Sequence, residues 1–517
     1  MANTQIFQSN RGALLPHTDK LNEEYAAAYA FDDRHLLAQY AATGCLNSTF
    51  YADASLQLQT LLDTAKNVEP SFIAKTAVYC REKGFMKDTP ALLTAVLTQR
   101  GQDYLPAVFP RVIGNGKMLR NVVQILRSGA VGRKSLGTRP KKLVQHWLNS
   151  ASERELLSAA IGTQPSLADI IKMVHPKPSE SWREAFFAWV IDKPYDGEQL
   201  PPLTKAFEAY KRDPSGLVPD VPFQLLTALP RDTAQWTQIA LNASWQMLRM
   251  NLNTFARHGV FDDSQVVSVL AAKLRNPEAI AKARVIPYQL LSAYKAAGEA
   301  LPSELANALQ DALEISLANV PELAGKVVVC PDVSGSMSSS VTGARGSATS
   351  SVRCIDVAAL MAAALLRKNS QTRVLAFEND VVDMVLNSRD SLMTNAQKLA
   401  AIGGGGTNCS APLRRLNRTK TDADLVIFVS DNQSWVDDKG HGATAMMQEW
   451  ALFKKRNPKA KLVCLDIQPY RTTQAAERQD ILNIGGFSDA VFSIIAAFAK
   501  DELTPAHWVD VIEDTVL

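Results

Sequence analysis

Apolar residues recur at helical spacing along the first 320 or so positions of the chain. The run from Leu58 to Ala65 places apolar side chains at i, i+3, i+4 and i+7, on one face of a helix. A second helix is predicted with Thr89 as N-cap, Pro90 at its first position and Gly101 at its end, and a third from Ile286 to Ala297, closed by Gly298. Such helices, joined by short turns that contain Gly and Pro, predict an array of stacked helix pairs, although no fixed repeat length is evident.

The pattern changes at about residue 323, where short β-branched apolar runs begin to alternate with amphipathic stretches. The apolar runs are 326–330, 373–377, 425–429 and 461–465, and the amphipathic stretches lie near 355–368, 391–402, 410–418 and 445–456. Strands that are apolar on both faces and alternate with helices predict a doubly wound, mostly parallel α/β sheet. We therefore expect a multidomain protein, with an all-α region over 1–322 and an α/β region over 323–517.

Composition narrows the class of protein. The chain has 517 residues, of which 46% are hydrophobic and 21% charged, as in ordinary globular proteins. No apolar run approaches the roughly 18 residues that span a bilayer, and the N-terminus has no basic segment followed by an apolar one. We therefore expect a cytoplasmic location. The six cysteines form no CxxC pair, which predicts reduced thiols in the core.

Positive charge is concentrated in one stretch. The totals, 55 Lys and Arg against 52 Asp and Glu, leave a net charge of only +3. Residues 104–152 nevertheless contain no acidic residue and carry nine basic ones: Arg111, Lys117, Arg120, Arg127, Arg133, Lys134, Arg139, Lys141 and Lys142. The apolar residues between 117 and 127 predict a helix with one buried and one cationic face, and 132–142 reads as a loop leading into another helix. The stretch is a candidate for binding a polyanion, and a solvated basic face without a ligand is the alternative.

Polar side chains gather where the expected strands end. Asp332, Ser334 and Ser336 follow the first strand, Thr407 ends the glycine-rich loop 403–406, and Asp431 follows the strand 425–429. Ligands of doubly wound sheets bind at the carboxyl ends of strands, so these residues are expected to converge. Two carboxylates and three hydroxyls form an all-oxygen set suited to a hard divalent cation, Mg²⁺ first and Mn²⁺ or Ca²⁺ as alternatives. Because three ligands are neutral, the ion would keep positive charge for an outside carboxylate or phosphate.

The same residues argue against an enzyme. A phosphatase of the dehalogenase type needs a second Asp two residues after the first, and Ser334 occupies that position. The chain has no GxxxxGKS/T, HExxH or GxSxG motif, and its seven histidines are scattered. We therefore expect a non-catalytic protein.

The segments DVSGS at 332–336, GGGGTN at 403–408 and VSDNQ at 429–433 resemble the metal-ion-dependent adhesion site (MIDAS) of von Willebrand factor A domains. The resemblance implies that Asp332, Ser334, Ser336, Thr407 and Asp431 surround a divalent ion, some of them through water. It also leaves open a protein-interaction scaffold, in which the ion captures an Asp or Glu of a protein partner.

A helical region, the segment HPKP at 175–178, the helix ARVIPYQLLSAY at 283–294 and a C-terminal A domain together resemble the Ro autoantigen family, also called the TROVE family. The compact size suggests a bacterial member. The resemblance implies a monomeric ring of HEAT-like helical repeats closed by the A domain. Single-stranded ends of misfolded or unprocessed RNA would enter its hole, and Y-like small RNAs would bind its basic outer surface. An exoribonuclease tethered through such RNA would link the protein to RNA quality control, maturation or decay.

The resemblance also assigns individual residues. His175 matches the histidine that the family places at the rim of the hole, and Lys177 lies beside it, although a histidine next to two prolines is also an ordinary turn residue. Animal members carry basic residues three to four helical turns before this histidine, where the present chain has Ser158 and Gly162. The contact with single strands is therefore expected to fall to Lys172, Lys177 or the basic residues between 111 and 142.

Overall fold

The computed structural model describes residues 15–517 except 45, 228, 230, 284, 286, 298–300, 345–351, 370, 437–441, 504 and 505. Contacts divide the chain into two units, one joining residues 1–64 with 317–511 and the other joining 65–316 with 512–517. The described residues before 64 therefore group with the C-terminal region, whereas the sequence pattern assigned them to the helical region. The reason is long-range pairing between short strands, which leaves no helical or alternating pattern in the sequence.

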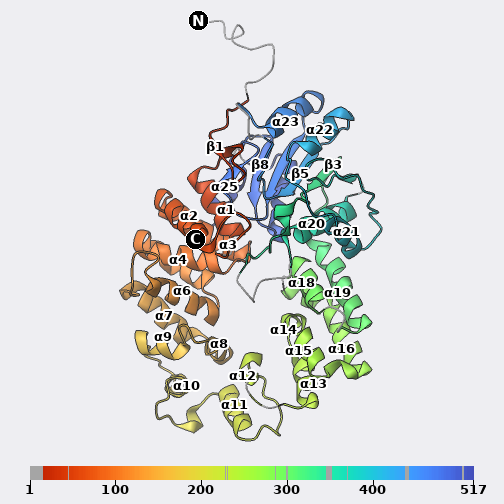
Figure 1. Ribbon diagram of the computed structural model, residues 1–517. Coiled ribbons are helices and arrows are strands. Elements are labelled where there is room, and N and C mark those ends of the chain that lie inside the picture. The colour runs from red at the N-terminus through yellow and green to blue at the C-terminus, as the bar shows by residue number, and fades with distance from the viewer. Residues whose placement is uncertain are drawn as a thin grey trace. The chain divides into compact units, whose positions relative to one another are not determined.

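Residues 65–316 form helices that pack against their neighbours along the chain (Figure 1). This confirms the predicted all-α array for the described part of the unit. The helices are α3 (Pro70–Glu82), α4 (Asp88–Arg100), α5 (Leu105–Val112), α6 (Gly116–Ser128), α7 (Thr138–Ser150), α8 (Glu153–Ala159), α9 (Leu167–Val174), α10 (Ser181–Val190), α11 (Pro202–Arg212), α12 (Phe223–Leu226), α13 (Thr233–Asn242), α14 (Trp245–Met250), α15 (Leu252–Arg257), α16 (Ser264–Leu274), α17 (Pro277–Ala283), α18 (Pro287–Ala297) and α19 (Ser303–Ser316).

One helix start was predicted incorrectly. Helix α4 begins at Asp88 with Lys87 at the N-cap position, so Thr89 lies inside the helix and is buried instead of capping it. Gly101 does end the helix, and its N–H donates to the carbonyl of Leu97 at 3.0 Å. The residues predicted to flank α18, at 286 and 298, lie outside the described part of the chain. Across the described residues, no helix combines the length and apolar character needed to cross a membrane.

The C-terminal region contains a five-stranded parallel sheet of strand order β4-β3-β5-β6-β8. This is the doubly wound arrangement that the sequence predicted. Regular pairing of β4 ends earlier than expected, at 374, although Phe377 N still donates to Pro331 O at 3.1 Å. Strand β8 was not predicted because Asn483 and Gly485 interrupt its apolar pattern. The strands are β3 (Val327–Pro331), β4 (Thr372–Val374), β5 (Leu425–Ser430), β6 (Lys461–Asp466) and β8 (Ile481–Gly485).

Alternate residues of the strands face two layers of helices, and every residue of β3, β5, β6 and β8 is buried. One face packs a cluster that includes Cys330, Phe428 and Cys464 against Trp450 and Phe453. The helices of this region are α20 (Cys354–Lys368), α21 (Leu392–Ala400), α22 (Ala411–Arg418), α23 (Ala445–Arg456), α24 (Asp489–Ala499) and α25 (His507–Glu513), the last of which crosses the unit boundary. The five described cysteines are buried, as predicted, and form no disulfide with one another, and the sixth, at position 45, lies outside the described residues.

The chain before residue 64 adds a second sheet and two helices to this region. Strands β1 (Lys20–Leu21), β2 (Ala27–Ala30) and β7 (Thr472–Thr473) form a small antiparallel sheet of order β1-β2-β7. Helix α1 (Asp33–Thr43) contacts β8, and α2 (Ala54–Asn67) follows it. A Cβ added to Gly485 would lie 2.6 Å from Gln39 Oε1, so glycine is required for this close approach.

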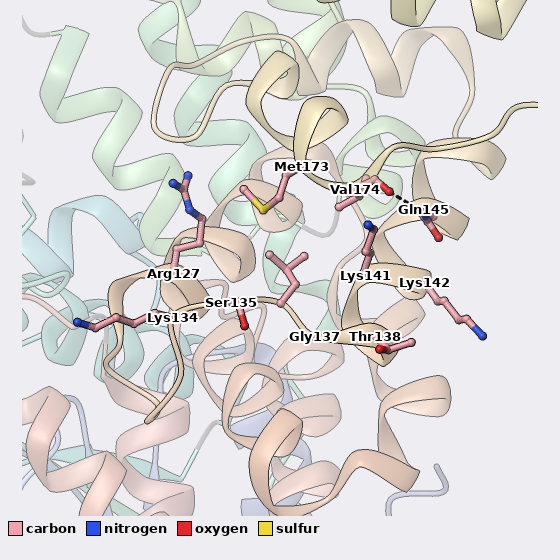
Figure 2. Close-up of a pocket in the computed structure, with 11 residues that line it drawn as sticks. Arg127, Lys134, Ser135, Gly137, Thr138, Lys141, Lys142, Gln145, Met173 and Val174 are labelled. Carbon is pink, nitrogen blue, oxygen red and sulfur yellow. Dashed lines mark hydrogen bonds between the residues drawn. The ribbon is translucent and has the colours of Figure 1, made fainter.

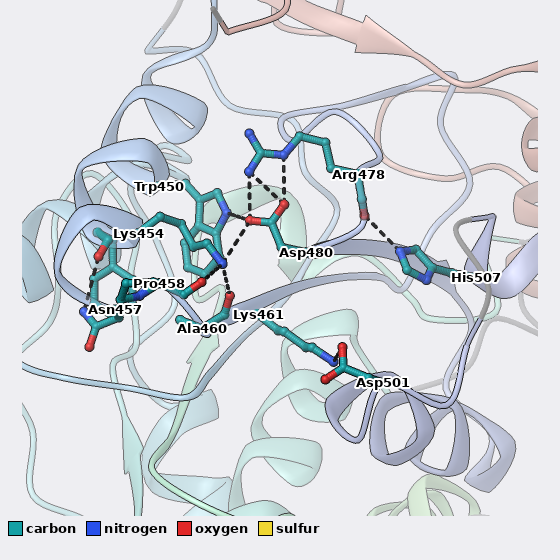
Figure 3. Close-up of polar contacts among 11 residues, drawn as sticks. Trp450, Lys454, Asn457, Pro458, Ala460, Lys461, Arg478, Asp480, Asp501 and His507 are labelled. Carbon is teal, nitrogen blue, oxygen red and sulfur yellow. Dashed lines mark hydrogen bonds and ion pairs between the residues drawn. The ribbon is translucent and has the colours of Figure 1, made fainter. Parts of the chain in front are cut away.

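A polar network fixes the far edge of the parallel sheet (Figure 3). The carboxylate of Asp480, just before β8, accepts hydrogen bonds from Trp450 Nε1 at 2.9 Å and from both ends of the Arg478 guanidinium. Burial alone would raise the pKa of Asp480, but these donors outweigh burial and hold the pKa below its ordinary value. At the start of β6, Lys461 pairs with Asp501 at 2.5 Å. These contacts attach α23 to the segment before β8, and the start of β6 to the residues after α24.

Candidate functional site

The structure brings all five predicted metal ligands together at the carboxyl ends of β3 and β5. Ser334 N donates to Asp332 Oδ1 at 2.9 Å, and the hydroxyls of Ser334 and Ser336 lie 3.3 Å apart. Thr407 Oγ1 donates to Ser334 Oγ at 2.9 Å, and Ser336 hydrogen-bonds to the carboxylate of Asp431. The strand order reverses beside β3, so this cluster occupies the topological switch point of the sheet.

The glycine-rich loop reaches this cluster because its backbone can adopt positive φ angles. Gly335 N donates to Gly405 O at 3.0 Å, and Gly404 N donates to Val333 O at 3.1 Å. Gly404 has φ 135°, and a Cβ on Gly405, φ 68°, would lie 2.2 Å from Glu378 Oε2. A side chain at 404 would strain the backbone, and one at 405 would also clash with the side chain of Glu378.

The electrostatics of the cluster suit a cation. Asp332 and Asp431 are 0% and 1% exposed. Burial raises the pKa of both, and the charge of Asp332 helps to raise that of Asp431 to about 7. Asp431 Oδ2 has no hydrogen-bond partner among the described residues, which is costly for a buried carboxylate. A divalent ion would satisfy this oxygen and offset the two charges, so the donor set fits a hard cation.

Two polar residues beside the cluster escaped the sequence analysis. Ser430 Oγ donates to Asp332 Oδ2 at 2.5 Å and so orients the first carboxylate. Asp466, at the end of β6, is a third buried carboxylate, and it accepts hydrogen bonds from Asn432 and Gln39. Ser430 ends β5, which neighbours β3, and Asp466 ends β6, the next strand of the sheet. Their positions at strand ends were the available signal. No group of three His, Cys, Asp or Glu side chains with metal-binding geometry occurs within the described residues.

The predicted amphipathic helix of the basic stretch is α6. Val122 and Val123 are buried, whereas Lys117 and Arg127 are exposed on its other face. The side chain of Asn115 caps the start of the helix by accepting from Met118 N at 3.0 Å. The predicted loop after it leads into α7, so this part of the sequence interpretation is confirmed.

Three of the nine basic residues are engaged within the protein. Arg111 forms a two-pronged ion pair with Glu82 at 2.7 Å for each nitrogen, and Arg139 pairs with Asp103 at 2.8 Å. Arg133 donates to the backbone carbonyls of Ser135 at 2.8 Å and Thr98 at 3.2 Å. Both acidic partners come from outside residues 104–152. A stretch that contains no Asp or Glu in the sequence can therefore still have acidic side chains beside it in the folded structure.

Four other cations surround a cavity of about 730 Å³ between α6, α7 and α9. Figure 2 shows Arg127 and Lys134 on one side of it and Lys141 and Lys142 on the other. No acidic side chain belongs to the lining. Its remaining members are the apolar residues Leu136, Met173 and Val174 and the polar or small residues Ser135, Gly137, Thr138 and Gln145, none of which the sequence analysis had singled out as ligand contacts. The cavity thus combines positive charge with an apolar wall.

The segment with the predicted histidine adjoins this cavity. His175 ends α9 in the left-handed region with φ 50° and is exposed, as are Lys172 and Lys177. Gln145 Nε2 donates to the carbonyl of Val174 at 2.6 Å and to that of His175 at 3.3 Å. The backbone around His175 is therefore attached to α7, and its imidazole is exposed.

Comparison with known proteins gives matches to both the helical region and the C-terminal region. Residues 326–499 match the family described as "Ro60 vWA domain". The chain is 24% identical to the RNA-binding protein RO60 of Deinococcus radiodurans over 94% of this chain and 98% of that one. The chain is therefore similar to a Ro protein over nearly its whole length. The RNA-binding protein RO60 of Caenorhabditis elegans is 23% identical over 49% of this chain and 40% of that one. The crystal structure of the D. radiodurans Ro protein matches with a TM-score of 0.61 and 19% identity, over 91% of this chain and 100% of that one.

The structure accounts for one departure from the Ro family pattern described above. Gly162 has φ 112°, and a Cβ there would lie 1.5 Å from Arg120 Nη1. The guanidinium of Arg120, which comes from α6, therefore occupies the space that a side chain at 162 would fill. Partial burial lowers the pKa of Arg120.

Proposed function

We propose that this chain binds RNA through the cationic face formed by α6, α7 and α9. The observation that carries the proposal is the cavity lined by Arg127, Lys134, Lys141 and Lys142 without an acidic residue. Lysine and arginine side chains bind backbone phosphates, and Leu136 offers an apolar wall to a base or sugar. The names of the D. radiodurans and C. elegans relatives, both RNA-binding proteins, support it.

The proposal has finer parts that follow the family resemblance. Y-like small RNAs would bind this cationic face. Single-stranded ends of misfolded or unprocessed RNA would meet Lys172, His175 and Lys177 at a central hole of a monomeric ring. The protein would act without catalysis in RNA quality control, maturation or decay in the cytoplasm, with an exoribonuclease tethered through the bound RNA.

Reversing two exposed lysines of the cavity tests the RNA face. In Lys134→Glu/Lys142→Glu, we expect RNA affinity to fall and the plot of log affinity against log salt to become shallower by about 1.4 to 1.8, since each lost phosphate contact removes about 0.7 to 0.9. Filter binding of a small structured RNA at several salt concentrations measures both quantities. The charge-matched control is Lys455→Glu/Lys459→Glu, which reverses two exposed lysines in and after α23. Equal behaviour of the two double variants would refute the assignment.

We also propose that the five residues at the carboxyl ends of β3 and β5 bind a divalent cation, Mg²⁺ first and Mn²⁺ or Ca²⁺ as alternatives. The unpartnered Asp431 Oδ2 and the all-oxygen donor set support this site. A bound ion would present positive charge to a carboxylate or phosphate from outside.

A protein-interaction scaffold is the second candidate function. The position of the proposed metal site at the carboxyl ends of β3 and β5, where ligands of such sheets bind, favours it. In this case the ion would capture an acidic residue of a protein partner. Material purified from its own cells separates the two functions. RNA binding predicts co-isolated RNA, seen as a high ratio of absorbance at 260 to 280 nm, whereas a scaffold predicts a protein partner that EDTA releases.

A further inference from the structure

Arg120, on α6, is a half-buried arginine whose charge no described residue offsets. Its Nε atom is enclosed without an acceptor, and no ion pair or hydrogen bond joins its guanidinium to another residue in the described part of the chain. Burial lowers its pKa, and no carboxylate acts in the opposite direction. A guanidinium stays charged at neutral pH, so a positive charge is held here in a partly desolvated place.

Other arginines of the same unit have acidic partners. Arg111 forms an ion pair with Glu82, and Arg275, which is half-buried like Arg120, pairs with Asp311 at 2.7 Å. Buried donors in folded proteins are almost always satisfied, by the protein, by water or by a ligand. Because Arg120 carries a full charge, an anion from outside satisfies it better than a water molecule does.

Gly162 provides the space that the guanidinium of Arg120 occupies. Its φ is 112°, and a Cβ there would lie 1.5 Å from Nη1 and 2.5 Å from Cζ of Arg120. Glycine is therefore required at 162 if the arginine is to keep this position. Gly162 and the next two residues, Thr163 and Gln164, are exposed, so a ligand can approach this side of the guanidinium from solvent.

Arg120 also lies on the cationic face of α6. Lys117, Arg120 and Arg127 are three and seven residues apart, which places them along one side of the helix. Arg127 lines the cationic cavity, and the seven residues between it and Arg120 correspond to about 10 Å along the helix axis. An RNA strand that enters the cavity can therefore reach Arg120 with a neighbouring phosphate.

We propose that Arg120, positioned by Gly162, binds a backbone phosphate of the RNA beside the cavity. The inference rests on the RNA face proposed above and adds to it a separate contact and the glycine on which that contact depends. The planar guanidinium can donate two parallel N–H groups to the oxygens of one phosphate. Because the side chain is already held in place, little conformational entropy is lost on binding. Gly162 is a positioning residue, since it acts through Arg120.

Filter binding of a labelled RNA hairpin with a single-stranded extension, at several salt concentrations, tests the contact. In Arg120→Gln, we expect RNA affinity to fall about tenfold, the scale of a hydrogen bond to a charged group. The plot of log affinity against log salt should become shallower by about 0.7 to 0.9, the effect of one lost phosphate contact. The matched control, Arg275→Gln, removes the same charge from a half-buried arginine that has a partner, and it should bind RNA like the wild type.

A double-mutant cycle tests the role of Gly162. Gly162→Ala is expected to weaken RNA binding as much as Arg120→Gln does, because the added Cβ displaces the guanidinium, and to have no further effect in the Arg120→Gln background. Gly132→Ala is the control for backbone strain, since Gly132 has φ 79° and a Cβ there would meet nothing within 4 Å. Additive effects of the two substitutions, or equal weakening by Gly132→Ala, would overturn the positioning role.

The variants separate this inference from the proposed function. Unchanged binding in both Lys134→Glu/Lys142→Glu and Arg120→Gln would overturn the RNA face and the Arg120 contact together. Weaker binding in the lysine variant alone would overturn only the Arg120 contact. Equal loss of affinity in Arg120→Gln and Arg275→Gln would also overturn it, because net charge would then account for the effect.

Discussion

His35 is held as a neutral imidazole inside the C-terminal region. It stacks on Phe31 with ring centroids 4.4 Å apart and meets Trp508 edge-on at 5.7 Å. Burial lowers its pKa to about 4, against the opposing charge of Asp32 and a hydrogen bond with the backbone of Asn483. The Nε2 atom has no described partner, so protonating the ring would bury a positive charge that Asp32 offsets only in part.

This histidine predicts a dependence of stability on pH. Its folded pKa of about 4 lies below the unfolded value of about 6.5, so the unfolded chain binds more protons between these values. Its contribution is complete above about pH 6.5 and is lost as the pH falls towards 4, by up to about 3 kcal/mol. Urea unfolding at pH 7.5, 5.5 and 4.5 measures it, followed by the fluorescence of the buried tryptophans. In His35→Gln the midpoint is expected to change less with pH, and an equal slope in both proteins would exclude His35 as the cause.

At the scale of elements, the contact between α6 and α8 positions the cationic face. A Cβ on Gly116, the first residue of α6, would lie 2.3 Å from both Cα and Cβ of Ala159 in α8. The two helices therefore meet with no room for a methyl group. Asn115 caps the start of α6, and Gly129 ends it with φ 87°. Packing and caps together orient Lys117 and Arg127 outwards.

Gly116→Ala is expected to lower the free energy of unfolding. Overpacking costs about 1–3 kcal/mol, and the better helix propensity of alanine returns up to about 1 kcal/mol of this. The matched control is Gly114→Ala, because a Cβ at that position would meet nothing within 4 Å. Urea unfolding of both variants at pH 7.5 makes the comparison. Equal midpoints would show that α6 and α8 can separate without cost.

At the scale of the whole molecule, the two candidate sites belong to different units of the chain. The cationic cavity lies within residues 65–316, and the metal cluster lies within the unit that joins 1–64 to 317–511. Neither site shares a residue with the other. The proposed activities are therefore separable by substitutions in one site at a time.

Asp332→Ala is expected to abolish binding of Mg²⁺ or Mn²⁺ and to leave RNA affinity within about twofold, a change below about 0.4 kcal/mol. Calorimetry with the metal and filter binding with the RNA report the two activities on the same preparation. The Lys134→Glu/Lys142→Glu variant should show the reverse result, with RNA binding weakened and metal binding kept. Equal loss of both activities in Asp332→Ala would instead mean that RNA engages through the ion.

Local patterns in the sequence were sufficient for most elements and for the donor set. The amphipathic stretches at 355–368 and 445–456 match α20 (Cys354–Lys368) and α23 (Ala445–Arg456) to within one residue. The five proposed metal ligands lie close together because each follows a strand or ends a loop at the same edge of the sheet. A strand end is a local feature, so the order of strands and helices was enough to bring these ligands together.

Only the tertiary structure decided which charges are available and which distant segments meet. Glu82 and Asp103 pair with Arg111 and Arg139 from outside the acid-free stretch, and Gln39 donates to the carboxylate of Asp466, which lies 427 positions later in the sequence. Periodicity reports only on neighbours within a few residues, because it arises from the repeat of one helix or strand. Ion pairs and hydrogen bonds between distant segments depend on how those elements pack, which no local pattern records. The sequence by itself determined the elements and the type of each site, and the packing determined which side chains are left to bind a ligand.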